Sequence, residues 1–245
     1  VNAQSRSIAI DIDIDDSTTG EQIIDEFTVF DNPVRPVAYR NGVRYVEDFN
    51  TIQTDDTGIE IKKQGVYLIT GGLGGIGIEM AKYLATQNRV KLVLIGRAGL
   101  PPHESWSGIS KEESKQAEKI RVLLEIEQSG SKVLVISADV SNPVQMEKAI
   151  IEVHEKSGKI DGVIHCAGIA GEGFLFKKEE DTFINVLRPK IQGTWILDRL
   201  TREDTPDFFI LCSALTALTG AVGQGDYTAA NAYLDAFSAF RNREG

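Results

Sequence analysis

The sequence is poor in the residues that build disulfide frameworks and zinc sites. It has two cysteines and three histidines in 245 residues, with no CxxC spacing and no histidine-rich tract. Cys166 and Cys212 each lie in an apolar, strand-like run, so we expect two buried free thiols. Such thiols are typical of a reducing compartment. The composition therefore argues against a bound metal or a disulfide scaffold and favours a cytoplasmic protein.

Long hydrophobic runs and an excess of positive charge are also missing. No apolar run approaches the roughly 20 residues that a membrane-spanning helix needs, and the N-terminal residues lack the pattern of a signal peptide. Asp and Glu total 36 against 26 Lys and Arg, a formal net charge of −10. Because an acidic surface repels phosphate backbones, neither nucleic acid nor a membrane is an expected partner. A local basic pocket for a cofactor phosphate remains compatible with this charge.

The pattern of apolar and polar residues changes near residue 65. Residues 1–65 contain an alternating run, Ile8–Ile14, the segment Glu26–Phe30, and two short candidate strands, Val37–Arg40 and Val43–Val46. The Asn-Gly between these two strands is a strong hairpin signal. We expect a reduced, β-rich structural subdomain, which is too small for an independent core and therefore packs on the rest of the chain.

Residues 66–245 alternate between strand and helix patterns, which predicts βαβ units and a parallel sheet covered on both faces. Unbroken apolar runs such as VYLIT and FFILC are typical of strands buried in a parallel sheet. The fold class is therefore α/β, a Rossmann-like doubly wound parallel sheet. The expected strands are Val66–Thr70, Lys91–Ile95, Lys132–Ser137, Ile160–His165 and Phe208–Cys212. The expected helices are Ile76–Thr86, Lys111–Gln128, Pro143–Ser157, Glu179–Leu200 and Tyr227–Arg243.

A glycine-rich loop links the first of these strands to its helix. Glycines allow a tight turn and a close approach of the backbone to a pyrophosphate, and the helix N-terminus offers free N–H groups to the anion. Strand, loop and helix occur in the order that a dinucleotide site requires, which favours cofactor binding over a merely tight turn. The loop residues are Gly71, Gly72, Leu73, Gly74, Gly75, Ile76 and Gly77.

Residues after the next three strands complete the predicted cofactor site. Arg97 stands where a dinucleotide site for NAD places an acid, and an arginine there accommodates the 2′-phosphate of NADP. NADPH is therefore the expected cofactor. Asp139 and Val140 are expected to flank the adenine, and the small Ala167 and Gly168 the nicotinamide ribose. The two residues before Ala167 are interpreted as packing residues.

Tyr227 and Asn231 lie four residues apart, on one face of the last predicted helix. Here the chain resembles the short-chain dehydrogenase/reductase superfamily and, within it, the ketoreductase domains of modular polyketide synthases. The matching runs are YLITGGLGGIGIEMAKYLA, LVLIGR, SADVS, VIHCAG, RPKIQGTWIL and GQGDYTAANAYLDAF. The resemblance implies that Tyr227 protonates the substrate carbonyl and that Lys190 stabilises the developing phenolate. Asn231 then stands where the wider superfamily has its lysine.

The chain departs from this family at its catalytic serine. The serine that hydrogen-bonds the substrate carbonyl lies thirteen residues before the tyrosine, and position 214 is alanine. Ser213 does not simply replace it, because adjacent residues that leave a strand point to opposite sides. An engineered Ser→Ala change is our leading explanation; a naturally impaired domain and a local one-residue shift are the alternatives. We expect NADPH binding with poor reduction of ketones, because of the vacant serine position at Ala214.

Two further departures concern stereochemistry and the end of the chain. Ala170-Gly171-Glu172 replaces the Leu-Asp-Asp motif of one subclass, and Thr219 replaces the tryptophan of the other. The handedness of the product stays open, and such departures favour a synthase served by a free-standing acyltransferase. The family continues beyond the tyrosine helix with a strand, a substrate lid and a final strand, so we expect residues 66–245 to be truncated or incompletely ordered.

The leading hypothesis is an NADPH-dependent ketoreductase that acts in polyketide biosynthesis. Its implied substrate is a β-ketoacyl thioester, or alternatively an α-ketoacyl thioester, on an acyl carrier protein, with neighbouring synthase domains as further partners. A free-standing ketoacyl or ketone reductase is the second hypothesis, against which the Lys190 and Asn231 arrangement argues. A non-catalytic, cofactor-binding pseudo-domain is the third, and Ala214 favours it.

Overall fold

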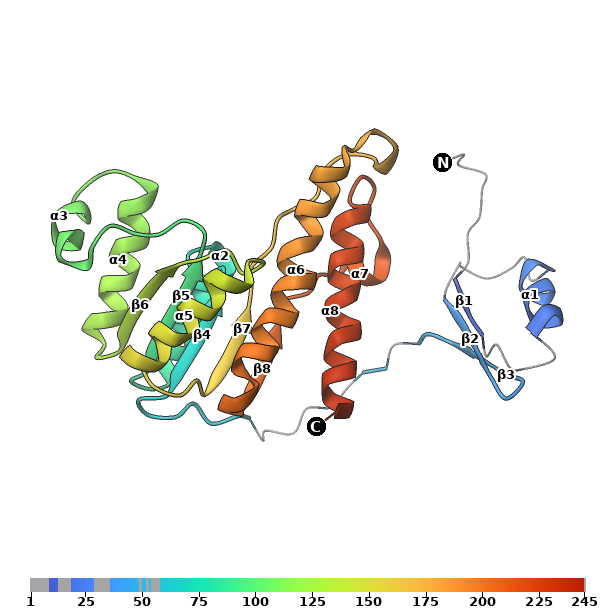
Figure 1. Ribbon diagram of the computed structural model, residues 1–245, viewed down its shortest axis with the longest axis horizontal. Coiled ribbons are helices and arrows are strands. Elements are labelled where there is room, and N and C mark those ends of the chain that lie inside the picture. The colour runs from blue at the N-terminus through green and yellow to red at the C-terminus, as the bar shows by residue number, and fades with distance from the viewer. Residues whose placement is uncertain are drawn as a thin grey trace. The chain divides into compact units, whose positions relative to one another are not determined.

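The computed structural model describes residues 9–12, 19–28, 36–48, 50–51, 53 and 58–244. The chain forms two compact units, Val1–Gly58 and Ile59–Gly245, which are described separately below (Figure 1). None of the described helices is both long and apolar enough to cross a membrane.

The N-terminal unit holds a three-stranded sheet in the order β1-β2-β3. Strands β2 (Val37–Arg40) and β3 (Val43–Val46) form an antiparallel hairpin. Its turn residues Asn41 and Gly42 have φ angles of 51° and 74°, as a two-residue hairpin turn requires, and the predicted hairpin is confirmed. Strand β1 (Ile10–Asp11) pairs parallel to β2 and is shorter than the expected Ile8–Ile14 strand; residues 8, 13 and 14 of that expected strand lie outside the described residues.

The three-stranded sheet confirms the small β-rich subdomain, and helix α1 (Thr19–Thr28) is an element that the sequence patterns do not predict. Glu26 to Thr28 form the end of this helix. The sequence pattern did not reveal this, because a short apolar run cannot by itself distinguish a helix from a strand. Contacts with residues far away in the sequence stabilise the helix. The buried carboxylate of Glu26 accepts hydrogen bonds from the Tyr39 hydroxyl at 2.6 Å and from Arg44 Nη2 at 2.9 Å. These bonds join the helix to both strands of the hairpin.

The C-terminal unit is built on a five-stranded parallel sheet with the strand order β6-β5-β4-β7-β8. From β4 the chain adds β5 and then β6 on one side, and it then crosses to the other side of β4 to add β7 and β8. The direction of strand addition therefore reverses between β4 and β7. Ligands of such sheets bind outside the carboxyl ends of the strands at this reversal. The strands are β4 (Val66–Thr70), β5 (Lys91–Gly96), β6 (Lys132–Ser137), β7 (Gly162–His165) and β8 (Phe208–Leu211).

Helices cover both faces of this sheet, so the Rossmann-like doubly wound fold is confirmed (Figure 1). Alternate residues of β4 enter two separate cores: Leu68 packs with α5 and α6, and Ile69 packs with α2 and α4. Helices α6 and α8 run side by side. The α-helices are α2 (Gly75–Gln87), α3 (Trp106–Ile109), α4 (Lys115–Gln128), α5 (Pro143–Lys156), α6 (Glu180–Thr201), α7 (Thr216–Thr219) and α8 (Gly225–Glu244). Short 3₁₀ turns are η1 (His103–Ser105), η2 (Leu175–Lys177) and η3 (Arg202–Asp204).

Several predicted boundaries move by a few residues. Helix α4 begins at Lys115 rather than Lys111, because Ser114 caps it by accepting a hydrogen bond from the Ala117 N–H at 3.1 Å. Strand β7 begins at Gly162 rather than Ile160, and β8 ends one residue before Cys212. Cys212 therefore belongs to the loop that leaves the sheet.

A buried histidine ties β7 to β4 and α6. His165 Nε2 lies 3.0 Å from the Pro189 carbonyl oxygen, and Nδ1 lies 2.6 Å from the Thr70 hydroxyl oxygen. Because a carbonyl only accepts, Nε2 carries the proton and Nδ1 accepts from Thr70. Burial, assisted by the nearby Lys190 charge, lowers the pKa of His165 to about 3. The imidazole is therefore neutral in the folded protein at neutral pH.

Gly162 cannot accept a side chain without a shift of the sheet. A Cβ there would lie 2.4 Å from the Phe208 ring, which stacks on Tyr67 with ring centroids 5.6 Å apart. We expect Gly162→Ala to lower the free energy of unfolding by about 1–3 kcal/mol, as measured by urea denaturation. The control is Gly108→Ala, whose Cβ meets no atom within 4 Å; equal losses in the two variants would contradict this account.

The neutral His165 makes the folded protein sensitive to acid. Its folded pKa of about 3 lies below the ordinary 6.5, so the unfolded chain takes up the proton first as the pH falls. The stability from the neutral imidazole is complete above about pH 6.5 and is lost as the pH falls from 6.5 toward 3. Over that window, we expect His165→Gln to reduce the slope of unfolding free energy against pH by up to about 1.4 kcal/mol per unit. Denaturant titrations at several pH values measure the slope, and an unchanged slope would rule out this role.

Candidate functional site

The glycine-rich turn between β4 and α2 is packed too tightly for side chains at Gly71, Gly72 and Gly77. Gly71 has a φ of 66°, which glycine adopts without strain, and a Cβ there would lie 2.8 Å from the Ala167 nitrogen. A Cβ at Gly77 would lie 2.4 Å from the Gly71 carbonyl oxygen. The turn therefore lies directly against the first turn of α2 and the end of β7.

The N-terminus of α2 is open to an anion. Its cap residue, Gly74, has no side chain to satisfy the first N–H groups of the helix, and Gly74, Gly75 and Ile76 are exposed. These N–H groups and the positive end of the helix dipole suit a pyrophosphate. The side chain of Leu73 is buried in the core, so only its backbone is available to a ligand.

The residues after β5 and β6 present one cation and one carboxylate at the same edge. Arg97 is exposed, and its guanidinium makes no hydrogen bond or ion pair within the described part of the chain. Asp139 is half-buried, and its Oδ1 accepts from the Ser141 N–H at 2.9 Å and hydroxyl at 2.6 Å. Val140 is buried in the core between the sheet and α5. Its backbone, rather than its side chain, is available to a cofactor.

Lys190 of α6 is the most constrained cation of the site. Only 4% of the residue is exposed, and its Nζ donates to the Cys212 carbonyl oxygen at 2.8 Å. A Cβ at Gly168 would lie 3.0 Å from Lys190 Cε, so the absence of a side chain there leaves room for the lysine side chain. Burial lowers the pKa of Lys190 below its ordinary value, and the nearby thiols of Cys212 and Cys166 oppose this change.

The structure brings Lys190 and Tyr227 together, although 36 residues of sequence separate them. Lys190 Nζ lies 5.9 Å from the centroid of the Tyr227 ring. Asn231 follows one turn later on α8, is fully buried, and donates from Nδ2 to the Tyr227 carbonyl oxygen at 2.7 Å. Its Oδ1 is buried and has no hydrogen-bond partner among the described residues. An unsatisfied buried acceptor is uncommon, so a donor from a ligand would fit there.

Position 214, where the family resemblance predicts a serine, lies shortly after the end of β8. Ala214 is half-buried after β8, at the turn that enters α7. The neighbouring Ser213 hydroxyl donates to the Asn231 carbonyl oxygen at 3.3 Å, toward the middle of α8. Ser213 therefore uses its hydroxyl on the helix backbone, and Ala214 has no hydroxyl to offer.

The two cysteines lie beside this cluster and are half-buried rather than fully buried. They follow the ends of β7 and β8, and their Sγ atoms are 3.1 Å apart. The hydrogen bond from Cys166, together with the Lys190 charge, lowers the pKa of the Cys212 thiol to about 7. The same pairing raises the pKa of Cys166. Sequence reasoning assigned Cys166 to packing and did not foresee a thiol pair at the site.

Sequence reasoning also missed a buried ion pair next to Tyr227. Lys178 Nζ lies 2.5 Å from Asp226 Oδ2, and neither side chain is more than 3% exposed. Asp226 immediately precedes Tyr227 in the run GQGDY. An acidic residue directly before the tyrosine was the one local sign of this pair. Its partner, Lys178, lies 48 residues earlier, and no local sequence pattern identifies that lysine.

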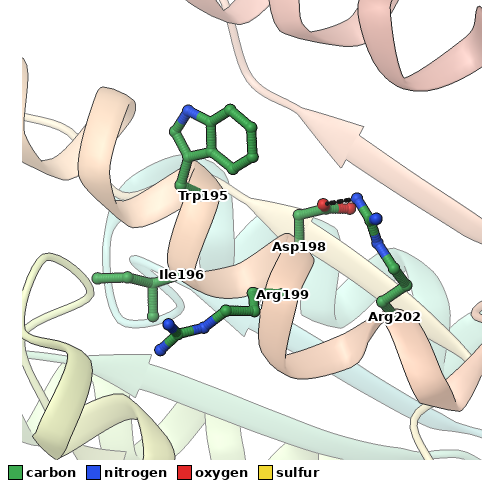
Figure 2. Close-up of a pocket in the computed structure, with 5 residues that line it drawn as sticks. All are labelled: Trp195, Ile196, Asp198, Arg199 and Arg202. Atoms are coloured by element: carbon green, nitrogen blue, oxygen red, sulfur yellow. Dashed lines mark hydrogen bonds and ion pairs between the residues drawn. The ribbon is translucent and has the colours of Figure 1, made fainter. Parts of the chain in front are cut away.

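A separate hollow of about 300 Å³ lies along the C-terminal half of α6 (Figure 2). The Asp198 carboxylate at this hollow is already paired with Arg202 at 2.5 Å and with Arg241 at 2.8 Å. The hollow contains none of the predicted site residues. It is lined by Trp195, Ile196, Asp198, Arg199 and Arg202.

A family model, curated proteins and solved structures that are similar to this chain all indicate the same family. The KR domain model matches residues 65–245. Polyketide synthase PksN of Bacillus subtilis (strain 168) is 34% identical over 209 residues, and PksL of the same organism is 38% identical over 213 residues. These matches cover 84% and 82% of this chain but only 4% and 5% of the synthases. The chain thus corresponds to a small part of each relative.

Solved ketoreductase structures share the fold. A ketoreductase domain from the bacillaene assembly line is 30% identical with a TM-score of 0.79, covering 96% of this chain and 53% of that one. An N-terminal ketoreductase from the macrolactin assembly line is 32% identical with a TM-score of 0.68, covering 83% and 38%. From the matched residues and these relatives, the chain belongs to the KR domain family, the ketoreductase domains of polyketide synthases.

Proposed function

We propose that this domain uses NADPH to reduce the keto group of an acyl thioester carried on an acyl carrier protein. The observation that carries the proposal is the buried Lys190 ammonium, 5.9 Å from the Tyr227 ring. The two residues lie at the carboxyl ends of β7 and β8, beside the strand whose glycine turn opens α2 to an anion. A cofactor cradle and a proton donor thus share one edge of the sheet.

The residues present fit NADPH. The first N–H groups of α2 would hold the pyrophosphate, and the unpaired guanidinium of Arg97 would hold the 2′-phosphate. Asp139 and the backbone of Val140 would flank the adenine, and the backbone of Ala167 and Gly168 would border the nicotinamide ribose. When bound, the cofactor supplies the hydride.

The chain's own contribution is the proton and its electrostatic support. Tyr227 would donate its phenolic proton to the carbonyl oxygen, and the Lys190 ammonium would stabilise the negative charge that develops on the phenol. Because Lys190 is buried, its field is less screened than that of a surface lysine. Asn231 would orient the first turns of α8 and offer Oδ1 to a donor. Ala214 withholds one hydrogen bond from the carbonyl, so turnover would be slow.

The family relatives support the wider setting of this proposal. Because the matched relatives are polyketide synthases, we propose a carrier protein and neighbouring synthase domains as partners in a cytoplasmic assembly. The substrate would be a β-ketoacyl, or alternatively an α-ketoacyl, thioester, in a synthase served by a free-standing acyltransferase. Residues 1–65 would serve as a structural subdomain. A cofactor-binding pseudo-domain is the second candidate, and Ala214 is the observation that favours it.

Restoring the serine is the direct test of the catalytic proposal. We expect Ala214→Ser to raise kcat for a simple ketone such as decalone by about 10²–10³-fold, the usual effect of one oxyanion-type donor. NADPH oxidation followed at 340 nm measures the rate, and Tyr227→Phe in the same background should abolish the gain. Ala217→Ser in α7 is the matched control and should gain nothing. Absence of any gain in Ala214→Ser would favour the pseudo-domain, and preference for a carrier-bound over a free thioester would support the synthase setting.

Arg97 should set the choice between NADPH and NADH. We expect Arg97→Gln to weaken NADPH binding by about 10–100-fold, as expected for loss of a charged hydrogen bond, and to leave NADH binding nearly unchanged. Fluorescence titration of the reduced cofactors measures both constants without turnover. Arg89→Gln, an exposed arginine near the opposite end of β5, is the control. Equal weakening of both cofactors by Arg97→Gln would contradict a role at the 2′-phosphate.

A further inference from the structure

The Lys178–Asp226 ion pair is unusual among the ion pairs of the described residues because both side chains are buried. Their exposed fractions are 3% and 0%, whereas the Lys156–Glu152 pair on α5 has exposed fractions of 59% and 38%. Removing two charges from water costs more than a surface pair does, and loss of one partner leaves an uncompensated buried charge. A change at either residue of such a pair is therefore expected to disturb the groups that the pair contacts.

Asp226 contacts Tyr227 through the backbone. Its Oδ1 accepts a hydrogen bond from the Tyr227 N–H at 2.9 Å, while its Oδ2 binds Lys178 Nζ at 2.5 Å. One carboxylate thus holds the amide of Tyr227 in the first turn of α8 and the lysine that precedes α6. An acidic group in the first turn also suits the helix dipole.

The loop between β7 and α6 lies directly against this carboxylate. A Cβ at Gly171 would lie 2.2 Å from Asp226 Oδ1, and a Cβ at Gly225 would lie 2.9 Å from the Leu175 side chain. The loop therefore contacts the start of α8 at two points besides the ion pair. Movement of Lys178 would be transmitted to the turn that carries Tyr227.

The charges around the first three turns of α8 compensate one another. The Asp226 carboxylate pairs with the ammonium of Lys178 in the loop, and the exposed Asp235 carboxylate acts on the ammonium of Lys190 in α6. The thiols after β7 and β8 lie beside the α6 ammonium. An unpaired carboxylate one residue from Tyr227 would oppose negative charge on the phenol, and Lys178 cancels it. The groups concerned are Asp226, Asp235, Lys178, Lys190, Cys166 and Cys212.

We propose that Lys178 and Asp226 form a positioning pair, which fixes the turn carrying Tyr227 and keeps the net charge beside the phenol near zero. The inference rests on the proposed function of Tyr227 as the proton donor. In this proposal the loop before α6 supports proton transfer by Tyr227, although its residues do not touch the reacting atoms.

The test uses the full chain with Ala214→Ser as background, and the two single changes Lys178→Met and Asp226→Asn. Activity falls at high pH when the proton donor ionises. Lys178→Met leaves a buried carboxylate and should move this basic limb upward by about one pH unit, whereas Asp226→Asn leaves a buried ammonium and should move it downward by a similar amount. We expect kcat to fall tenfold or more in both, with the KM for NADPH within threefold.

The double variant Lys178→Met/Asp226→Asn separates positioning from simple stability. It removes both charges and keeps an amide oxygen to accept from the Tyr227 N–H, so the basic limb should return to that of the background and kcat should recover to within about threefold. Lys156→Met, which breaks the exposed pair on α5, is the matched control and should leave kcat and the pH profile unchanged. Lowered melting temperatures with an unmoved basic limb in the single variants would overturn the inference.

Two neutral double variants keep the test decisive if the single variants do not fold. Lys178→Met/Asp226→Asn retains the acceptor for the Tyr227 N–H, and Lys178→Met/Asp226→Ala removes it. We expect kcat at least tenfold lower in the second, and equal kcat values would overturn the inference. If the Ala214→Ser background binds NADPH but reduces no ketone, the proposed function fails and this inference fails with it. An active background with unaffected variants would refute only the positioning pair.

Discussion

The site depends on a buried ammonium group, Lys190, held next to a tyrosine. A buried charge is costly unless polar groups surround it, and this one is supported by the Cys212 carbonyl oxygen at 2.8 Å. That carbonyl is available because β8 ends one residue earlier. The position of α6 is fixed in turn by the His165 hydrogen bond to Pro189. The sheet, one strand end and one helix together determine where the charge lies.

Close backbone approach is the second constraint, and glycines satisfy it at each junction of the site. Gly71 and Gly77 let the glycine-rich turn lie against α2, Gly168 leaves room for the Lys190 side chain, and Gly171 brings the loop before α6 to Asp226. A Cβ at any of the four would lie 3.0 Å or less from a neighbouring atom. The same close packing that shapes the glycine-rich turn therefore also brings the start of α8 against the loop before α6.

Charge compensation joins these features into one electrostatic unit. The Lys190 ammonium helps lower the pKa of the Cys212 thiol to about 7 and acts on buried His165 in the same direction. The Lys178–Asp226 pair balances the charge one residue before Tyr227. Because these groups are buried or half-buried, water screens them less than it screens surface charges, and a change in one charge alters the electrostatic environment of its neighbours.

The sequence predicts the doubly wound sheet, the glycine turn and the pairing of Tyr227 with Asn231, because hydrophobic period and residue spacing are local properties. It missed α1, the thiol pair and the Lys178–Asp226 ion pair, and it placed the start of α4 too early. Contacts between distant segments decide these features: Asp226 finds its partner 48 residues away, and Cys166 and Cys212 meet only because β7 and β8 pair in register. Tertiary packing alone brings such groups within reach and sets how far water is excluded from their charges.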